Sequence, residues 1–361
     1  MPKILLVGGA GYIGSVLSQE LLERGYAVRI LDRFFFGDQG LAAIRDRVEV
    51  VQADMRRIEA AHLEGVDTVI NVGGLSNDPT AEYNPAANYE MNTAAAVRLA
   101  ELARSAGVRR YLLASSCSVY DQGIADDQRD IVYDEDAVVR PRAAYAVSKY
   151  EAEQHLLAMA GADFCPVILR KGTVYGFSPR MRFDLVVNTF VRDALANGNI
   201  VLFRGGEMWR PLVDVHDVAR AYIACVGADE PAVHGQIFNV ANCNMRISEL
   251  ALRVRTTLRD LGIDVDVRPD YSYRGVRSYR VSTRKIERVL GFKAEVPVED
   301  AVRDMLGQLR DRKVEDLNHP KYENIRWLRV LEEAEAILGS SGSVFDLPAA
   351  TVTTLPRRAQ R

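Results

Sequence analysis

The sequence has no long apolar run, few cysteines and histidines, and no block of charge of one sign. Nothing approaches the roughly 18 uninterrupted apolar residues that span a bilayer, so we expect no membrane partner. A net charge of −3 without a basic cluster argues against nucleic acid as a partner. The five histidines are dispersed, so no metal site is expected. The cysteines lack CxxC spacing and predict free thiols in a reducing cytoplasm: Cys117, Cys165, Cys225 and Cys243.

The first half of the chain alternates short apolar runs with helical patterns. Strands that are apolar on both faces and alternate with helices predict an α/β fold, a Rossmann-type doubly wound parallel sheet. The expected strands are Lys3–Val7, Ala27–Leu31, Val48–Gln52, Thr68–Val72 and Arg110–Ala114, and the expected helices are Gly14–Arg24, Tyr89–Ala106 and Tyr145–Ala160.

The second half of the sequence does not continue this regular alternation, and it predicts a smaller mixed α/β lobe that binds substrate. We expect residues 1–176, with 210–243 returning to them, to form the cofactor domain, and 177–209 with 244–317 to form the lobe. Residues 172–182 are predicted as a loop. In the tail, 318–361, a helix over 322–338 is predicted to pack as core or to cover the substrate lobe, because its apolar residues have helical spacing.

A glycine-rich turn follows the first predicted strand. Gly8, Gly11 and Gly14 form GxxGxxG, which lets bare backbone meet a pyrophosphate at a helix N-terminus. Asp32 ends the next strand, where a carboxylate accepts hydrogen bonds from ribose hydroxyls and favours NAD over NADP, unless it is a helix cap. Arg33 beside it is the residue that would serve NADP. The other residues predicted to bind the cofactor are Tyr12, Ile13, Asp54 (at the adenine amino group), Met55, Val72, Gly73, Gly74, Tyr145 and Lys149 (as donor to the nicotinamide ribose).

Tyr145 and Lys149 are four residues apart at the start of a predicted helix, so both side chains lie on one face, about 6 Å apart at Cβ. An ammonium near a phenol, beside a cationic nicotinamide, lowers the pKa of a tyrosine towards neutrality. The phenolate can then take a proton from a substrate hydroxyl while hydride leaves the adjacent carbon. Three small hydroxyls lie at the carboxyl end of the fifth predicted strand, those of Ser115, Ser116 and Ser118, and one of them can hold the reacting oxygen and pass its proton.

These motifs together resemble the extended short-chain dehydrogenase/reductase family, specifically its nucleotide-sugar epimerase and dehydratase branch. The matching stretches are VGGAGYIG, Asp32, ADMRR, GVRRYLLASSCSVYD, YAVSK, RKGTVYG and WRPLVDVHDVARA. The resemblance implies that Ser116, Tyr145 and Lys149 are the catalytic triad and that Arg210 binds a substrate diphosphate, although a surface salt bridge is the alternative for Arg210. It also implies a homodimer through the helices around Ala95 and Glu151, and further substrate contacts from Ser76, Ser116, Thr173, Asn188, Arg274, Arg277 and Tyr279.

The sequence departs from the family pattern after Ser116. The 4,6-dehydratases have an Asp–Glu pair there, whereas this chain has Cys117 and Ser118, so dehydration by that route is disfavoured. Cys117 is either a small buried side chain or a thiol that acts on a keto intermediate. The preferred interpretation is an NAD-dependent nucleotide-sugar 4-epimerase with Tyr145 as acid/base. The alternatives are a dehydratase, a 4-ketoreductase or, more remotely, a non-catalytic NAD-binding protein.

Overall fold

The computed structural model describes residues 2–121, 131–272 and 277–341. Its centre is a seven-stranded sheet in the order β11-β7-β5-β4-β1-β2-β3, and every neighbouring pair of strands is parallel. The strands are β1 (Lys3–Val7), β2 (Ala27–Asp32), β3 (Glu49–Gln52), β4 (Thr68–Asn71), β5 (Arg110–Ser116), β7 (Cys165–Lys171) and β11 (Gln236–Val240). This confirms the predicted Rossmann-type α/β sheet.

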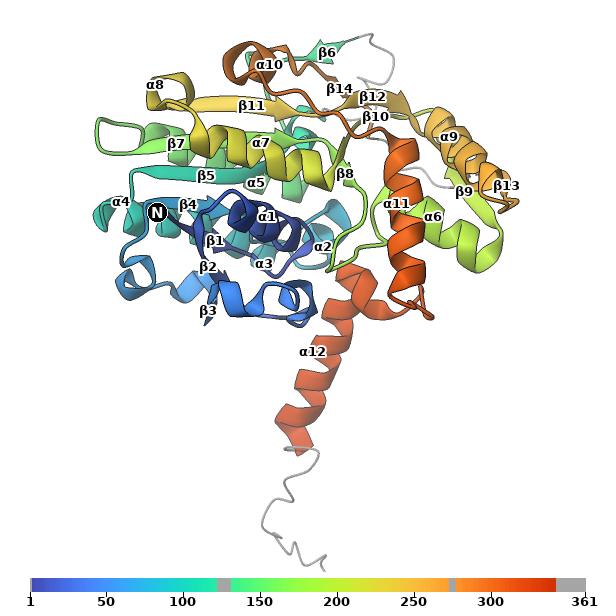
Figure 1. Ribbon diagram of the computed structural model, residues 1–361, viewed down its shortest axis with the longest axis horizontal. Helices are drawn as coiled ribbons and strands as arrows, with labels where there is room; N and C mark the ends of the chain where they lie inside the picture. The colour runs from blue at the N-terminus through green and yellow to red at the C-terminus, as the bar shows by residue number, and fades with distance from the viewer. Residues whose placement is uncertain (1, 122–130, 273–276, 342–361) are drawn as a thin grey trace, which may run out of the picture.

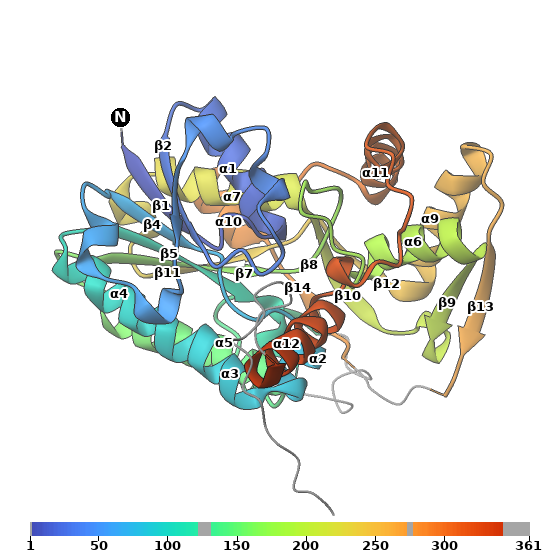
Figure 2. The same ribbon diagram turned by 90° about the horizontal axis from the view of Figure 1, so that it is seen from below.

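Helices cover both faces of this sheet (Figure 2). One face holds α1 (Tyr12–Glu23) and α7 (Val215–Gly227), and the other holds α4 (Ala95–Ser105) and α5 (Ala144–Ala158). Successive strand side chains point to opposite faces. Ile4 and Leu6 of β1 therefore join one apolar cluster, and Leu5 and Val7 join the other.

The connection after β4 differs from the single helix predicted over 89–106. It consists of α2 (Asp78–Tyr83), α3 (Pro85–Tyr89), a π-helical turn (Glu90–Ala94) and then α4. Proline at the second position of α2 and the first of α3 starts each short helix, because the missing proline N–H is not needed in a first turn.

A second lobe lies beside the carboxyl end of the sheet (Figure 1). It contains α6 (Val186–Asn197), α9 (Ile247–Asp260), α11 (Val298–Asp311) and a parallel pair of strands, β9 (Asn199–Phe203) and β13 (Asp266–Asp270). Between lobe and sheet, β8 (Thr173–Tyr175), β10 (Trp209–Asp214) and β12 (Cys243–Arg246) form a small sheet. The loop prediction for residues 172–182 is therefore wrong at β8, which pairs with β10.

The remaining elements are short. They are a two-stranded pair, β6 (Val132–Tyr133) with β14 (Arg280–Val281), the helices α8 (Glu230–Val233) and α10 (Arg284–Leu290), and 3₁₀ turns at Gln39–Leu41, Arg45–Arg47, Met55–Arg57, Ala60–Leu63, Cys117–Tyr120, Arg204–Gly206 and Pro320–Tyr322.

The last described helix, α12 (Asn324–Ser341), extends away from the body (Figure 1). Its first turns contact α2 and the cofactor half of the protein, while Val330, Ile337 and Leu338 farther along are exposed. The prediction that this helix packs as core or covers the substrate lobe is therefore wrong: only its start is packed. In the part of the chain that the structure describes, no helix combines the length and apolarity needed to cross a membrane.

Candidate active site

A cavity opens at the carboxyl ends of β1, β2 and β4, above the N-terminus of α1. It brings together almost all of the residues predicted to bind a dinucleotide. Those lining it are Gly8, Gly11, Tyr12, Ile13, Gly14, Asp32, Arg33, Met55, Val72, Gly73 and Gly74. The side chain of Ser76, predicted at the substrate, lines this cavity instead.

Two glycines make the turn above α1 possible. Gly8 has φ +80°, and a Cβ on it would lie 2.7 Å from the backbone of Gly73. A Cβ on Gly14 would lie 2.2 Å from the carbonyl oxygen of Gly8. Because any side chain would push the turn off the helix, these positions need glycine for the strand, turn and helix to pack this closely.

Asp32 is held rigidly at the cavity wall. Its carboxylate accepts hydrogen bonds from the backbone N–H groups of Ala10 at 3.0 Å and Phe34 at 2.8 Å. Burial nevertheless raises the pKa of Asp32. A fixed carboxylate at this place suits the ribose hydroxyls of a dinucleotide.

Asp54 does not line the cavity, although Ala53 and Met55 on either side of it do. Both of its oxygens accept hydrogen bonds from Arg56, and Arg33 donates to Oδ2 at 2.8 Å. The predicted contact with an adenine amino group is therefore corrected: Asp54 caps a 3₁₀ turn and binds two arginines. Arg33 is thereby engaged, with its guanidinium 3.9 Å above the Phe35 ring.

The three predicted catalytic residues come together at the end of β5. Ser116 is the last residue of β5, and its hydroxyl lies near the phenol of Tyr145, which is in the first turn of α5. The Nζ atom of Lys149, one turn later, lies 5.9 Å from the centre of the Tyr145 ring. The end of β5 and the start of α5 thus place an acid/base group, the Tyr145 phenol, beside a cation, Lys149.

The pKa of Tyr145 in the protein alone is set mainly by burial. Burial, and then the negative charge of Asp78, raise the pKa of Tyr145 to about 12, and the cations Arg182 and Arg277 only partly oppose this. Burial also lowers the pKa of Lys149 to about 8, against the attraction of Glu153. In the protein alone, desolvation of the phenolate outweighs its cationic neighbours; the expected pKa near neutrality includes the charge of a bound nicotinamide and stays a prediction.

A buried ion pair lies behind this triad. Glu153, one turn after Lys149, pairs with Arg170 of β7 at 2.6 Å, and both side chains are almost fully buried. Arg170 also donates to the Tyr120 hydroxyl at 2.8 Å. The Nζ atom of Lys171 donates to the Ser115 carbonyl at 2.7 Å. These contacts fix the ends of β5 and β7 against α5.

Cys117 lies in this buried layer. Its thiol is fully buried and donates to the Arg170 carbonyl at 3.1 Å, and burial raises its pKa. A thiol that reacts with a keto sugar needs exposure and a lowered pKa. The predicted catalytic role is therefore corrected to a small buried side chain at a strand end.

Arg210, Arg277 and Tyr279 of the predicted substrate site gather opposite Tyr145. Arg210 donates to the carbonyls of Trp209 and Arg277, and its guanidinium lies 5.7 Å from the Tyr279 ring centre. Burial lowers the pKa of Arg210. Arg277 forms an ion pair with Asp78 at the start of α2, a residue that sequence reasoning missed. Arg274 lies outside the described residues.

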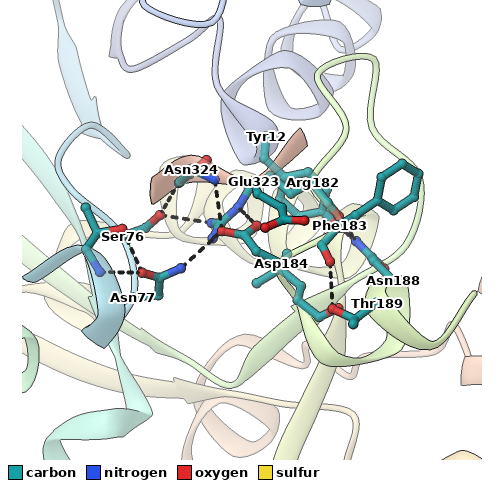
Figure 3. A network of polar contacts seen from close by, with 12 residues as sticks. Tyr12, Ser76, Asn77, Arg182, Phe183, Asp184, Asn188, Thr189, Glu323 and Asn324 are labelled. Carbon is teal, nitrogen blue, oxygen red and sulfur yellow. Dashed lines mark hydrogen bonds and ion pairs between the residues drawn. The ribbon is translucent and has the colours of Figure 1, made fainter. Parts of the chain in front are cut away.

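Two other predicted substrate residues have different surroundings. Asn188 is fully buried: its Oδ1 accepts from the N–H of Gly176, and its Nδ2 donates to the Arg182 carbonyl and the Tyr12 hydroxyl (Figure 3). The predicted substrate contact is thus corrected, because Asn188 fastens the segment after β8 to α1. Thr173 is half-buried in β8, paired with Leu212.

The cavity also contains residues that no motif indicated. Arg180, Arg182 and Asn324 line it. Arg182 and Asn324 donate hydrogen bonds to Ser76 and Asp184 (Figure 3), and Arg180 donates to Asn324. Asn92 is a further missed residue: a Cβ on Gly74 would lie 2.2 Å from its Oδ1. Asn92 sits in the π-helical turn, a feature common at functional sites, and MNTAAAV carries no apolar period that would have shown it.

Comparison with known proteins agrees with this geometry. The sequence model described as the NAD dependent epimerase/dehydratase family matches residues 4–241. The chain belongs to this family. The predicted membership of the extended short-chain dehydrogenase/reductases, in the nucleotide-sugar epimerase/dehydratase branch, is thereby confirmed, and so is NAD as the cofactor.

Individual relatives of this epimerase/dehydratase are distant. UDP-glucuronic acid decarboxylase 1 of Xenopus tropicalis is 28% identical over 233 residues, 63% of this chain and 54% of the relative, so the chain spans about half the length of that protein. UDP-glucuronic acid decarboxylase 1 of Arabidopsis thaliana is 26% identical over 86% of this chain and 70% of its own. The structure of MoeE5 in complex with UDP-glucuronic acid and NAD is 26% identical, with a TM-score of 0.73 over 86% of this chain and 99% of that chain.

The residues at the cavity fit NAD. The bare turn at Gly8 and Gly14 faces the N-terminus of α1, where free N–H groups favour a pyrophosphate. Asp32 suits the adenosine ribose, and Arg180 contributes a buried guanidinium whose Nε has no hydrogen-bond partner. Among the described residues, no cluster of side chains could hold a metal ion.

Proposed function

We propose that this protein is an NAD-dependent nucleotide-sugar epimerase that inverts C4 through a transient 4-keto sugar. The observation that carries this proposal is the grouping of Ser116, Tyr145 and Lys149. In the chain, Ser116 is followed by the buried thiol of Cys117 and the buried hydroxyl of Ser118. The Ser118 hydroxyl is buried without a hydrogen-bond partner, and no carboxylate occupies positions 117 and 118. Elimination of water by an acid/base pair at these positions is therefore unsupported.

The side chains divide the proton transfer among them. The Tyr145 phenolate takes the proton of the C4 hydroxyl, becomes the neutral phenol and later returns the proton, while the Ser116 hydroxyl holds the same oxygen. Protonated Lys149 stabilises the phenolate, which needs this help because its pKa is about 12 in the protein alone. The residues of the dinucleotide cavity would hold NAD, which would supply reversible hydride transfer at C4, so the net reaction would be redox-neutral.

Arg210 and Arg277 supply the charge that a nucleotide diphosphate requires. The Arg210 guanidinium lies 5.7 Å from the Tyr279 ring centre and donates to the Arg277 carbonyl, and diphosphate oxygens suit the planar donors of both arginines. The UDP-sugar named in the MoeE5 complex supports a substrate of this class. A homodimer through α4 and α5 remains a prediction.

The second candidate is a nucleotide-sugar decarboxylase or dehydratase. The relatives named as UDP-glucuronic acid decarboxylases favour it, and so does Asp78, a buried carboxylate close enough to Tyr145 to raise its pKa. In this chain, however, Asp78 already pairs with Arg277.

The test is incubation of the purified full chain with UDP-, GDP-, CDP- and dTDP-sugars. An epimerase gives a product of unchanged mass and inverted C4 by NMR, and Tyr145→Phe abolishes it. Loss of water, release of carbon dioxide or stoichiometric cofactor turnover would instead show a dehydratase, a decarboxylase or a ketoreductase. If Tyr145→Phe leaves the conversion unchanged, catalysis through the phenol is wrong.

A further inference from the structure

Part of the cofactor cavity is built by residues that lie far from the glycine turn in sequence. Arg180 comes from the segment between β8 and α6, and Asn324 and Leu328 come from α12. Asn324 and Leu328 also lie outside the stretch 4–241 that matches the family. Trp327 of α12 donates its indole N–H to the carbonyl of Phe35, which lines the same cavity. The start of α12 is thus fastened to the cofactor site.

Arg180 is the cation in this wall without a balancing anion. It is 7% exposed, its guanidinium lies 3.7 Å above the Phe36 ring, and Nη2 donates to Oδ1 of Asn324 at 2.6 Å. Its Nε has no partner, and no carboxylate among the described residues forms an ion pair with it. The neighbouring Arg182 and Arg33, in contrast, pair with Asp184 and Asp54.

A buried guanidinium without an ion-paired carboxylate is costly, because its charge is only partly compensated; Asp184 and Asp32 are near enough to oppose the shift of its pKa but form no ion pair with it. Burial and the positive charge of Arg182 lower the pKa of Arg180 to about 9, which expresses the same cost. Arg180 lines the same cavity as Asp32, the residue expected to bind the adenosine ribose. The group of a dinucleotide that carries negative charge next to that ribose is the pyrophosphate.

We propose that Arg180 binds the pyrophosphate of the dinucleotide and that Asn324, at the start of α12, positions its guanidinium for this contact. The pyrophosphate is then held from two sides, by the N–H groups of the glycine turn and by Arg180. The Phe36 ring keeps the guanidinium flat against the wall. The inference depends on NAD as cofactor and not on the reaction proposed above.

The test compares ADP with adenosine on the full chain freed of nucleotide, by calorimetry and without any activity measurement. Arg180→Gln is expected to weaken ADP binding by about 10- to 100-fold, as for a lost charge-assisted hydrogen bond, while adenosine binding is unchanged. Arg180→Lys should keep part of the ADP affinity. The matched control is Arg312→Gln, which removes an arginine lying 5.0 Å over the Phe177 ring away from the cavity and should change neither affinity.

Two further measurements separate binding from a structural role. Asn324→Asp places a carboxylate on Arg180 that competes with phosphate, so it should also weaken ADP binding and spare adenosine. The Tm of nucleotide-free Arg180→Gln should not fall, because the change removes an uncompensated charge. Equal losses for ADP and adenosine, an unchanged ADP affinity, or a lower Tm of the free protein would each overturn the proposal.

Discussion

The cofactor half and the substrate half of the site are built in different ways. In the cofactor half, the glycine turn, Asp32 and the residues after β4 come from strand ends of one rigid sheet, within the first 76 positions of the chain. In the substrate half, Asp78 contacts Arg277, 199 positions away, and Arg210 contacts the carbonyl of Arg277. Most of the cofactor half is therefore encoded by short-range sequence patterns, whereas the substrate half depends on the tertiary packing of loops.

Removal of the Tyr145 hydroxyl should separate the two halves most strongly. We expect Tyr145→Phe to lower kcat by about 10²- to 10⁴-fold, because the acid/base group is lost. The NAD dissociation constant should hardly change, since Tyr145 does not line the dinucleotide cavity. Steady-state kinetics and calorimetry measure the two effects. Tyr150→Phe, on the same helix, is the control and should leave kcat near the wild-type value; a similar loss in both variants would contradict the assignment.

The buried layer under both halves is tested by Glu153→Gln. This change leaves Arg170 buried without its carboxylate and should lower the free energy of unfolding by about 3–5 kcal/mol. The matched control is Glu230→Gln, which breaks an exposed ion pair with Arg109 and should alter stability little. Urea denaturation monitors both variants. Equal stabilities for the two would show that the buried pair does not stabilise the site.

Gly14→Ala tests how closely the cofactor half is packed. Its Cβ would meet the backbone of Gly8 and Gly9 at 2.2–2.8 Å, so we expect a loss of about 1–3 kcal/mol in stability together with weaker NAD binding. Gly307→Ala in α11 is the opposite case, because no atom lies within 4 Å of the new Cβ. It should stabilise the protein by up to about 1 kcal/mol. Thermal unfolding with and without NAD decides whether the two glycines differ in this way.

The fold and the cofactor half could largely be predicted from sequence for a physical reason. Apolar strands, GxxGxxG and the Asp at the end of β2 are local patterns whose spatial meaning is set by the parallel sheet. Even there, a local pattern failed at Asp54, since Arg33 and Arg56 compete for its oxygens. The sequence leaves two roles open for Cys117, because the burial of a side chain cannot be predicted from one position in a sequence.

The substrate half could be predicted only as a set of residue types. Asp78 lies in a short helix with no motif, and its partner is found only once the lobe is folded. Asn188 was predicted at the substrate, yet its amide is occupied by Tyr12, Gly176 and Arg182. The same limit holds in the cofactor half for Arg180 and Asn324, which meet across 144 positions, a separation over which no spacing rule applies.

The Asp78–Arg277 contact allows a test of the substrate half with the smallest expected effect, a shift in the pKa of Tyr145. Asp78→Asn removes a negative charge that raises the pKa of Tyr145, and it releases Arg277, whose charge lowers that pKa. Both effects favour the phenolate, so the pKa of Tyr145 should fall and the rise of kcat with pH should begin at lower pH. The pKa of Lys149 is governed by burial and Glu153, so any limb of the profile that reports Lys149 should stay in place. A pH–rate profile of Asp78→Asn, with Asp163→Asn at the exposed Arg104 pair as control, measures this. A shift of the same limb to higher pH would show that Asp78 acts on the substrate itself and not through the charge it presents to Tyr145.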